Sequence, residues 1–142
     1  MREEESMRKE LNEKIFNKDP IVRIVDPNYG QADYINKKYI MELKYRRDYG
    51  PEWFNGSLIE KTKYDFITKS CGNKIPGYVC KFNDGSYYAW NLKKVKEPDW
   101  YEKMLPETTD FKSRRFVPKM VGDLYLEDGV KLIWHRCLVL EC

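Results

Sequence analysis

The chain of 142 residues has the length of one ordinary domain and can bury a core without disulfides or a structural metal. With 42% hydrophobic residues it is too apolar for a disordered chain, yet we find no apolar run that reaches the 18 residues of a transmembrane helix. The net charge of +3 is too small to identify a partner. The charged start MREEESMRKE is unlike a signal peptide, so we expect a soluble, cytoplasmic protein that does not bind membranes.

The first part of the chain predicts a helix followed by three strands. Apolar residues recur at helical spacing within residues 3–17, and Pro20 marks the end of that helix. The β-branched run 21–25 (IVRIV) is typical of a short strand. Residues 31–36 and 38–46 then alternate between apolar and polar side chains, which indicates two strands joined by a tight turn.

The middle of the chain predicts a loop, a second helix and a hairpin. Glycine, proline and asparagine mark residues 48–57 as a loop, and the apolar spacing of residues 57–70 favours a helix. The apolar runs 77–82 and 86–92 flank an Asn-Asp-Gly turn, which is a strong hairpin signal.

Beyond Pro98 the pattern becomes irregular. We expect a long loop that contains residues 99–111, and then a last hairpin formed by residues 121–126 and 130–140. Taken together, the elements predict one domain over residues 1–142, of the α/β or α+β class, with a mixed β-sheet flanked by helices and an extra β-rich C-terminal part.

The cysteine and histidine content argues against several kinds of site. The four cysteines have spacings that match no zinc pattern, and a cytoplasmic chain keeps its thiols reduced. His135 is the single histidine and lies in the apolar run LIWHRCLVL, so a histidine-based triad lacks its parts and we interpret His135 as structural.

A pair of carboxylates stands out on the predicted hairpin. If residues 37–38 form a two-residue loop, Tyr34 pairs with Met41 and Asp33 lies directly opposite Glu42, with Cβ atoms about 4.5–5.5 Å apart. Facing carboxylates repel each other, and a hard cation such as Mg²⁺, which takes carboxylate and carbonyl oxygens, would compensate. Without metal, alanine in place of either carboxylate should then leave stability unchanged or raise it.

Lys44 completes the constellation. The period of two places Glu42 and Lys44 on one face of the strand, while Met41, Leu43 and Tyr45 point to the core. We expect the charged face to be the open one. A lysine beside a metal site can stabilise a pentacovalent phosphate or orient the attacking water. The carboxylate pair and Lys44 therefore supply the groups that phosphodiester hydrolysis needs.

A helix, three strands that carry D-x₈-E-L-K, a helix and further strands resembles the PD-(D/E)XK nuclease superfamily over about residues 3–92. The resemblance implies a restriction-endonuclease-like fold with the order αβββαβ. It also implies Mg²⁺-dependent cleavage of DNA, with Mn²⁺ able to substitute. In this family Asp33, Glu42 and the backbone carbonyl of Leu43 would bind the metal, and Lys44 would position or activate water.

The resemblance extends to the first helix, and the chain differs from the family pattern in two respects. The family often adds a helix glutamate to the metal shell, for which Glu10 and Glu13 are the candidates. Ala32 replaces the proline that names the motif, and residues 98–142 lie outside the match. Family members of this length tend to be stand-alone resolvase-like or repair-like enzymes, which are often homodimers, or small phage proteins.

Basic residues near the constellation predict DNA contacts. Arg46 and Arg47 continue the strand beyond the motif, and Lys61 and Lys63 follow on the second helix. Contacts to phosphates position a duplex without reading its sequence. For the helix we slightly prefer a plain ion pair between Glu60 and Lys63, which are three residues apart.

Another class of function remains open. The same fold can serve as a non-catalytic module that binds nucleic acid or a protein, with the acidic pair solvated or salt-bridged to Lys44. RNA cleavage is a third interpretation. Only the catalytic interpretations require a metal, so dependence on Mg²⁺ or Mn²⁺ separates them from the binding module.

Overall fold

The computed structural model describes residues 2–24, 34–53, 55–107 and 115–133. These residues form two helices, α1 (Arg2–Lys14) and α2 (Lys61–Ser70). Within the described ranges, neither helix is long and apolar enough to cross a membrane. The strands are β1 (Val22–Arg23), β2 (Tyr34–Ile35), β3 (Tyr39–Arg46), β4 (Gly56–Glu60), β5 (Ile75–Phe82), β6 (Tyr87–Asn91), β7 (Tyr101–Pro106), β8 (Phe116–Tyr125) and β9 (Val130–Lys131), and a 3₁₀ turn (Leu126–Asp128) precedes β9.

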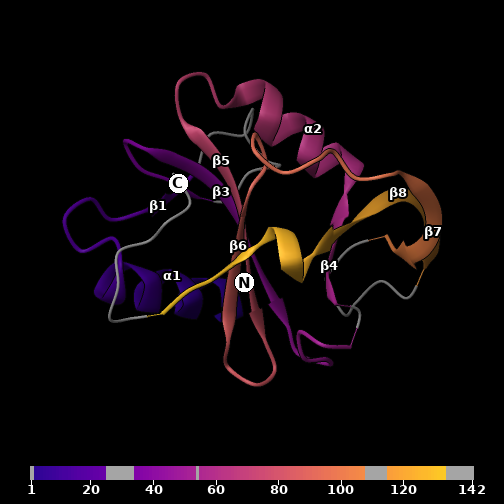
Figure 1. The fold of residues 1–142 in the computed structure, drawn as a ribbon, viewed down its shortest axis with the longest axis horizontal. Helices are drawn as coiled ribbons and strands as arrows, with labels where there is room; N and C mark the ends of the chain where they lie inside the picture. Colours follow the sequence, from indigo (N-terminus) through magenta and orange to yellow (C-terminus); the bar gives the residue numbers. More distant parts are fainter. Residues whose placement is uncertain (1, 25–33, 54, 108–114, 134–142) are drawn as a thin grey trace.

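The strands form two sheets. The larger has the order β1-β2-β3-β5-β6-β9, and it is mixed because β3 and β5 run parallel while the other neighbours are antiparallel. The smaller sheet is antiparallel, with the order β4-β8-β7. Figure 1 shows α1 on one side of the large sheet, and α2 with the small sheet on the other side. The protein is therefore of the mixed α+β kind.

The face of the large sheet beneath α1 is an apolar core. Met7 and Leu11 lie one helical turn apart and pack with Met41, Leu43 and Val79 of β3 and β5. All five side chains are buried. Burial of each helix side chain contributes about 1.5–3 kcal/mol, which fixes the helix on this face.

The opposite face of the same strands is buried as well. Ile40, Tyr78 and Trp90 alternate with the residues that face α1, and they pack with Ile59 of β4 and Ile67 of α2. The indole nitrogen of Trp90 donates a hydrogen bond of 2.8 Å to the backbone of β8. The small sheet and α2 therefore form a second layer over the large sheet.

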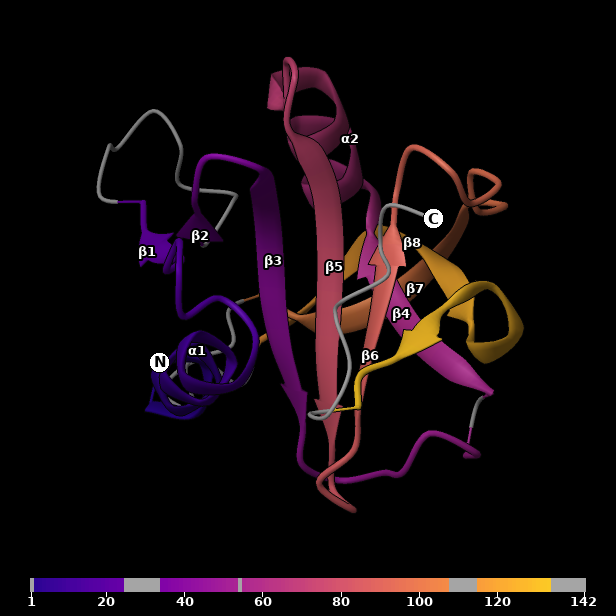
Figure 2. The same ribbon diagram turned by 60° about the vertical axis from the view of Figure 1, so that its left-hand side comes forward.

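The C-terminal strands reach beyond this second layer. β8 pairs with β4 along residues 121–125 and with β7 along residues 116–121. Close packing of β8 requires a glycine at position 122, where a Cβ atom would lie 2.4 Å from Pro98 and 3.0 Å from Trp100. The remaining part of β7 and β8 is a two-stranded ribbon, which lies behind β3 and β5 in Figure 2.

Three sequence predictions are wrong in this part of the chain. Residues 57–60 end strand β4 rather than begin a helix, and residues 101–106 form β7 rather than a loop. The last hairpin is also wrong, because β8 belongs to the small sheet while β9 pairs with β6 of the large sheet. The neighbouring apolar residues Leu58 and Ile59 suit a helix or a strand by local pattern, and only the distant partner β8 decides between the two.

Candidate functional site

The β2–β3 hairpin has the predicted two-residue loop. Tyr34 pairs with Met41 as the sequence predicts. The side-chain oxygen of Asn36 holds the turn by accepting hydrogen bonds of 3.0 and 2.7 Å from two backbone N–H groups. Asp33 lies outside the described residues, so its pairing with Glu42 stays a prediction.

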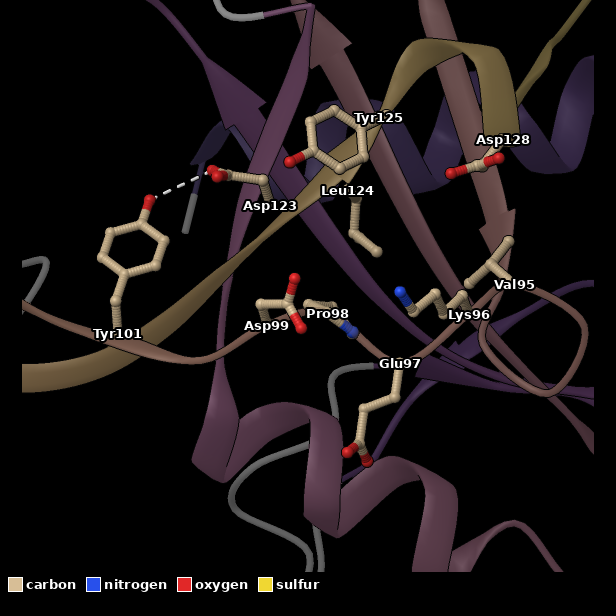
Figure 3. A pocket seen from close by; sticks show the side chains of 10 residues that line it. All are labelled: Val95, Lys96, Glu97, Pro98, Asp99, Tyr101, Asp123, Leu124, Tyr125 and Asp128. Carbon is tan, nitrogen blue, oxygen red and sulfur yellow. Dashed lines mark hydrogen bonds between the residues drawn. The ribbon is translucent and has the colours of Figure 1, made fainter.

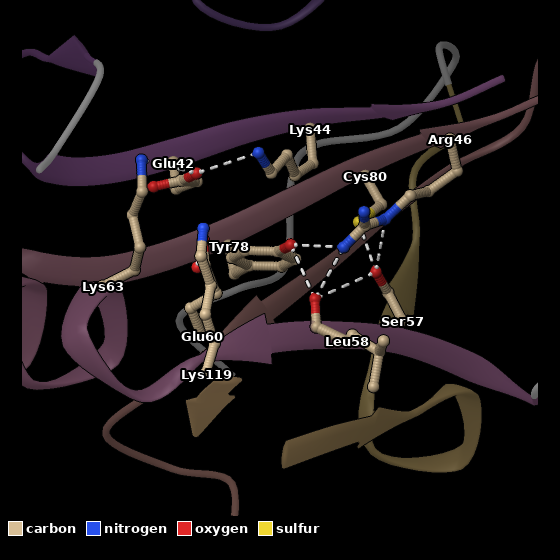
Figure 4. Close-up of polar contacts among 10 residues, drawn as sticks. All are labelled: Glu42, Lys44, Arg46, Ser57, Leu58, Glu60, Lys63, Tyr78, Cys80 and Lys119. Atoms are coloured by element: carbon tan, nitrogen blue, oxygen red, sulfur yellow. Dashed lines mark hydrogen bonds and ion pairs between the residues drawn. The ribbon is translucent and has the colours of Figure 1, made fainter. Parts of the chain in front are cut away.

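Glu42 and Lys44 project from β3 toward the second layer. The Glu42 side chain is only 1% exposed, and that of Lys44 is 20% exposed. The Lys44 ammonium is 3.9 Å from Glu42 Oε1, and the Lys63 ammonium of α2 is 3.1 Å from the same oxygen (Figure 4). The expectation of an open face is wrong here, because α2 and the small sheet cover it.

The two lysines give Glu42 its electrostatic environment. A buried carboxylate loses its hydration, which is costly unless opposite charges or hydrogen bonds replace the water. Lys44 comes from the same strand, whereas Lys63 comes from α2, so the Lys63–Glu42 ion pair also joins α2 to the large sheet. A divalent cation at Glu42 would have to share the carboxylate with Lys63 or displace it.

A pocket of about 170 Å³ opens beside Glu42, far more than the roughly 15 Å³ that one ordered water needs. Strands β3 and β5, α2 and the small sheet contribute to its wall. The charged residues of the wall are Glu42, Lys44, Arg46, Glu60, Lys63 and Lys119. Four basic side chains against two carboxylates give the pocket a net positive charge, which favours anionic ligands such as phosphates.

Arg46 lies inside a hydrogen-bond network rather than on an open surface. Its Nε donates to Ser57 Oγ at 3.0 Å, and its Nη2 donates to the Leu58 carbonyl at 2.7 Å and to the Tyr78 hydroxyl at 3.0 Å (Figure 4). Burial alone lowers the pKa of Arg46, but Tyr78 and Cys80 beside it hold that pKa above its usual value. Burial also raises the pKa of Tyr78, so a cationic Arg46 meets a neutral hydroxyl.

We therefore expect Arg46→Lys to lower the free energy of unfolding by about 2–3 kcal/mol, because an ammonium cannot reproduce the three directed hydrogen bonds. Urea denaturation measures this value. Arg47→Lys is the matched control, since the Arg47 side chain is 55% exposed and its replacement should cost no more than about 0.5 kcal/mol. Equal losses in the two variants would contradict the role of the network.

The other residues predicted to contact DNA have protein partners. Arg47 pairs with Glu3 of α1, and Lys61 pairs with Asp65 at 2.6 Å. Lys61 also lies 5.8 Å from the centre of the Trp100 ring. Both basic groups are partly exposed, so these surface pairs are weak and do not prevent a phosphate from competing for them.

The preferred ion pair of Glu60 with Lys63 is wrong. Glu60 is the last residue of β4, and its Oε1 lies 3.0 Å from the Lys119 ammonium of β8. Lys63 turns instead to Glu42. In the sequence, Lys119 ends a basic stretch, KSRRFVPK at residues 112–119, but nothing local shows that this last residue reaches the pocket.

The candidate glutamates of α1 do not join Glu42. Glu10 accepts hydrogen bonds from the Tyr87 hydroxyl and, at 3.4 Å, from Lys81, and these residues lie on the α1 face of the large sheet. Burial and the hydrogen bond to Glu10 raise the pKa of Tyr87. Glu13 is exposed on the helix. The sheet thus separates both glutamates from the pocket.

Glu42 and Leu43 are the residues of the predicted metal site that the structure describes. Leu43 has its side chain in the core, and its backbone lies between Glu42 and Lys44. Among the residues that the structure describes, no three histidine, cysteine or acidic side chains are grouped to hold a metal ion. A metal at Glu42 therefore requires further oxygen ligands, and Asp33 is the residue that the sequence predicts for this place.

A second pocket carries several carboxylates but none of the predicted site residues. Glu97, Asp99, Asp123 and Asp128 line it together with Lys96, and the Tyr101 hydroxyl donates to Asp123 at 3.1 Å (Figure 3). These carboxylates are not grouped as metal ligands. The pocket beside Glu42 therefore remains the candidate site.

Comparisons with known proteins do not identify the chain. No protein-family model and no curated protein matches its sequence. The functional assignment therefore depends on the residues around Glu42 and on the sequence resemblance that they carry.

Proposed function

We propose that this protein is a metal-dependent DNA nuclease of the PD-(D/E)XK type, an endonuclease that hydrolyses phosphodiester bonds. The observation that carries the proposal is that Glu42 and Lys44, two residues apart on β3, turn into the same positively charged pocket with 3.9 Å between carboxylate and ammonium. A carboxylate for a cation and a lysine for a phosphate are then within reach of one reacting group.

The order of elements supports a restriction-endonuclease-like arrangement. A helix precedes three strands, the motif lies on the third of these, and α2 then leads to β5, which runs parallel to β3. Strand β4 is an addition before α2, and it joins the C-terminal strands β7 and β8. The proposed core thus keeps the sequence order of the family and carries a small second sheet on one face.

The proposed mechanism assigns one task to each residue of the motif. Asp33, Glu42 and the Leu43 carbonyl would hold Mg²⁺ or Mn²⁺, which lowers the pKa of bound water and polarises the phosphate. Lys44 would donate a hydrogen bond to a phosphate oxygen as negative charge develops there, or orient the attacking water. Lys63 balances the charge of Glu42 in the protein without nucleic acid.

The rival function is a non-catalytic module that binds nucleic acid or protein. It has one specific observation in its favour, because Glu42 already meets two lysines and such a cluster also occurs as a purely structural ion pair. In that case the positive pocket would bind an anionic partner, and the carboxylate would serve only to balance the lysines.

Cleavage of a panel of labelled nucleic acids tests the proposal. The panel contains duplex, single strand, flap and four-way junction, each as DNA and, for the linear forms, as RNA. Every substrate is incubated with Mg²⁺, with Mn²⁺ and with EDTA, beside the Glu42→Gln protein. We expect metal-dependent DNA products from the wild type alone. A folded wild type that releases no products with either metal would support the binding module instead.

A further inference from the structure

The ribbon of β7 and β8 forms one wall of the pocket beside Glu42. This ribbon lies outside the part of the chain that resembles nucleases. Leu105 and Pro106 of β7 and Lys119 and Val121 of β8 line that pocket. The C-terminal strands are therefore positioned to touch whatever binds at Glu42.

Lys119 lies where this pocket meets a larger one. The adjoining surface pocket has a volume of about 610 Å³, and it shares Glu60, Lys63 and Lys119 with the first. Because three residues line both pockets, the two lie side by side between α2 and the ribbon. We call the two pockets together the α2–ribbon cleft. An extended ligand that occupies both of them passes Lys119.

The contacts of Lys119 leave it available to an anion. Its side chain is 25% exposed, and its ammonium is 3.0 Å from Glu60 Oε1 and 3.3 Å from the backbone carbonyl of Glu107. The Lys119 side chain keeps contact with water, so a phosphate that enters the cleft can replace the Glu60 carboxylate as its partner and exchange one anion for another.

The basic residues of the cleft come from three separate elements. Lys44 and Arg46 belong to β3, Lys61 and Lys63 to α2, and Lys119 to β8. Four carboxylates line the cleft as well, those of Glu42, Glu60, Asp65 and Glu107, so the basic side chains exceed the acidic ones by one. Basic groups on both sides of the cleft suit a ligand with a series of negative charges rather than a single small anion. A nucleic-acid strand has this property, because each nucleotide contributes one phosphate.

We propose that Lys119 binds a phosphate of the DNA strand that enters the α2–ribbon cleft, and that Glu60 competes for this lysine when DNA is absent. The inference rests on the proposed nuclease function and extends it by giving the C-terminal ribbon the task of holding the substrate. Lys119 is a substrate-binding residue in this account and takes no part in the chemical step.

The test compares two variants that break the same ion pair. Binding of a labelled DNA duplex is followed by fluorescence anisotropy in EDTA, so that no cleavage occurs. At 0.1 M salt we expect Lys119→Gln to bind about tenfold more weakly, and the slope of log K against log salt to shrink by about 0.9. Glu60→Gln should bind more tightly than the wild type, because it frees the lysine and removes a negative charge.

Lys14→Gln is the matched control. It removes the same charge from the exposed end of α1, on the other side of the large sheet, and should bind DNA within twofold of the wild type. Thermal unfolding by circular dichroism shows that each variant is folded. If Lys119→Gln and Glu60→Gln both weaken binding, or neither changes it, the pair is only structural and the inference is wrong.

The outcomes separate this inference from the nuclease proposal. Opposite effects of the two variants without any metal-dependent cleavage would support the cleft and overturn the nuclease. Cleavage by the wild type with unchanged binding by Lys119→Gln would do the reverse. A wild-type protein that binds no DNA at low salt would overturn both.

Discussion

Glu42→Gln is expected to abolish metal-dependent cleavage and to lower the free energy of unfolding in EDTA by about 1–3 kcal/mol. Glutamine keeps the size of the side chain but removes the negative charge. The ammonium groups of Lys63, at 3.1 Å, and of Lys44, at 3.9 Å, would then face each other across a neutral amide. The expected loss lies below the roughly 3–5 kcal/mol of a fully buried ion pair, because both lysines are partly exposed to water.

This expectation reverses the one drawn from sequence. Repulsion between Asp33 and Glu42 would make the loss of either carboxylate neutral or stabilising without metal. The structure sets two lysines against the one predicted repulsion, so removal of the Glu42 charge should lose more attraction than repulsion. Glu13→Gln is the control, because Glu13 is exposed on α1. Urea denaturation of Glu42→Gln that matches the wild type and Glu13→Gln would show that the lysine pairs add no stability.

Lys44→Ala should lower the single-turnover cleavage rate by about 10²- to 10⁴-fold while DNA affinity falls no more than about threefold. Lys44 lines the pocket beside Glu42, yet Lys63 is the closer partner of that carboxylate. The fold and the carboxylate should therefore tolerate the loss of Lys44, and the defect should appear in the chemical step.

Two measurements isolate that defect. Cleavage is followed with enzyme in excess over DNA, and affinity is measured separately by anisotropy in EDTA. Lys69→Ala removes a lysine from the exposed side of α2 and should leave both values unchanged. An undiminished rate in Lys44→Ala would remove Lys44 from the mechanism, and a parallel loss of rate and affinity would make it a binding residue only.

Local features of the hairpin could be predicted from sequence. The two-residue loop and the alternating side chains determine the pairing of Tyr34 with Met41, because a shift by one residue would turn every apolar side chain outward. The same alternation placed Glu42 and Lys44 on one face of β3. These features depend on residues within a few positions of each other, so no knowledge of the distant chain is needed.

The sequence could not predict in the same way that α2 and the small sheet cover the face of β3 that carries Glu42 and Lys44. Strand β4 pairs with β8, whose partner residues lie 61 to 69 positions later, and Leu58 and Ile59 give no sign of that partner. Glu60 is the last residue of β4 and faces Lys119. Lys63 lies on α2, which begins directly after β4, and it reaches Glu42. The error in the helix start therefore caused the error in the ion pair.

The helix glutamate shows a second limit of sequence. Periodicity places Met7 and Leu11 against the large sheet, but it does not tell which of the two sheet faces the helix covers. Because α1 lies on the face opposite Glu42, Glu10 reaches Tyr87 and Lys81. A prediction that depends on the relation between layers needs the three-dimensional arrangement.

The task proposed for Glu42 is to hold the metal for hydrolysis of DNA. Its most direct test is single-turnover cleavage of the preferred DNA substrate at increasing Mg²⁺, with the wild type and Glu42→Gln side by side and both shown to be folded. For the wild type we expect a cleavage rate that rises with Mg²⁺ and vanishes in EDTA, and for Glu42→Gln we expect no cleavage. Equal cleavage by the two proteins, or none by the wild type at any Mg²⁺ concentration, would contradict it.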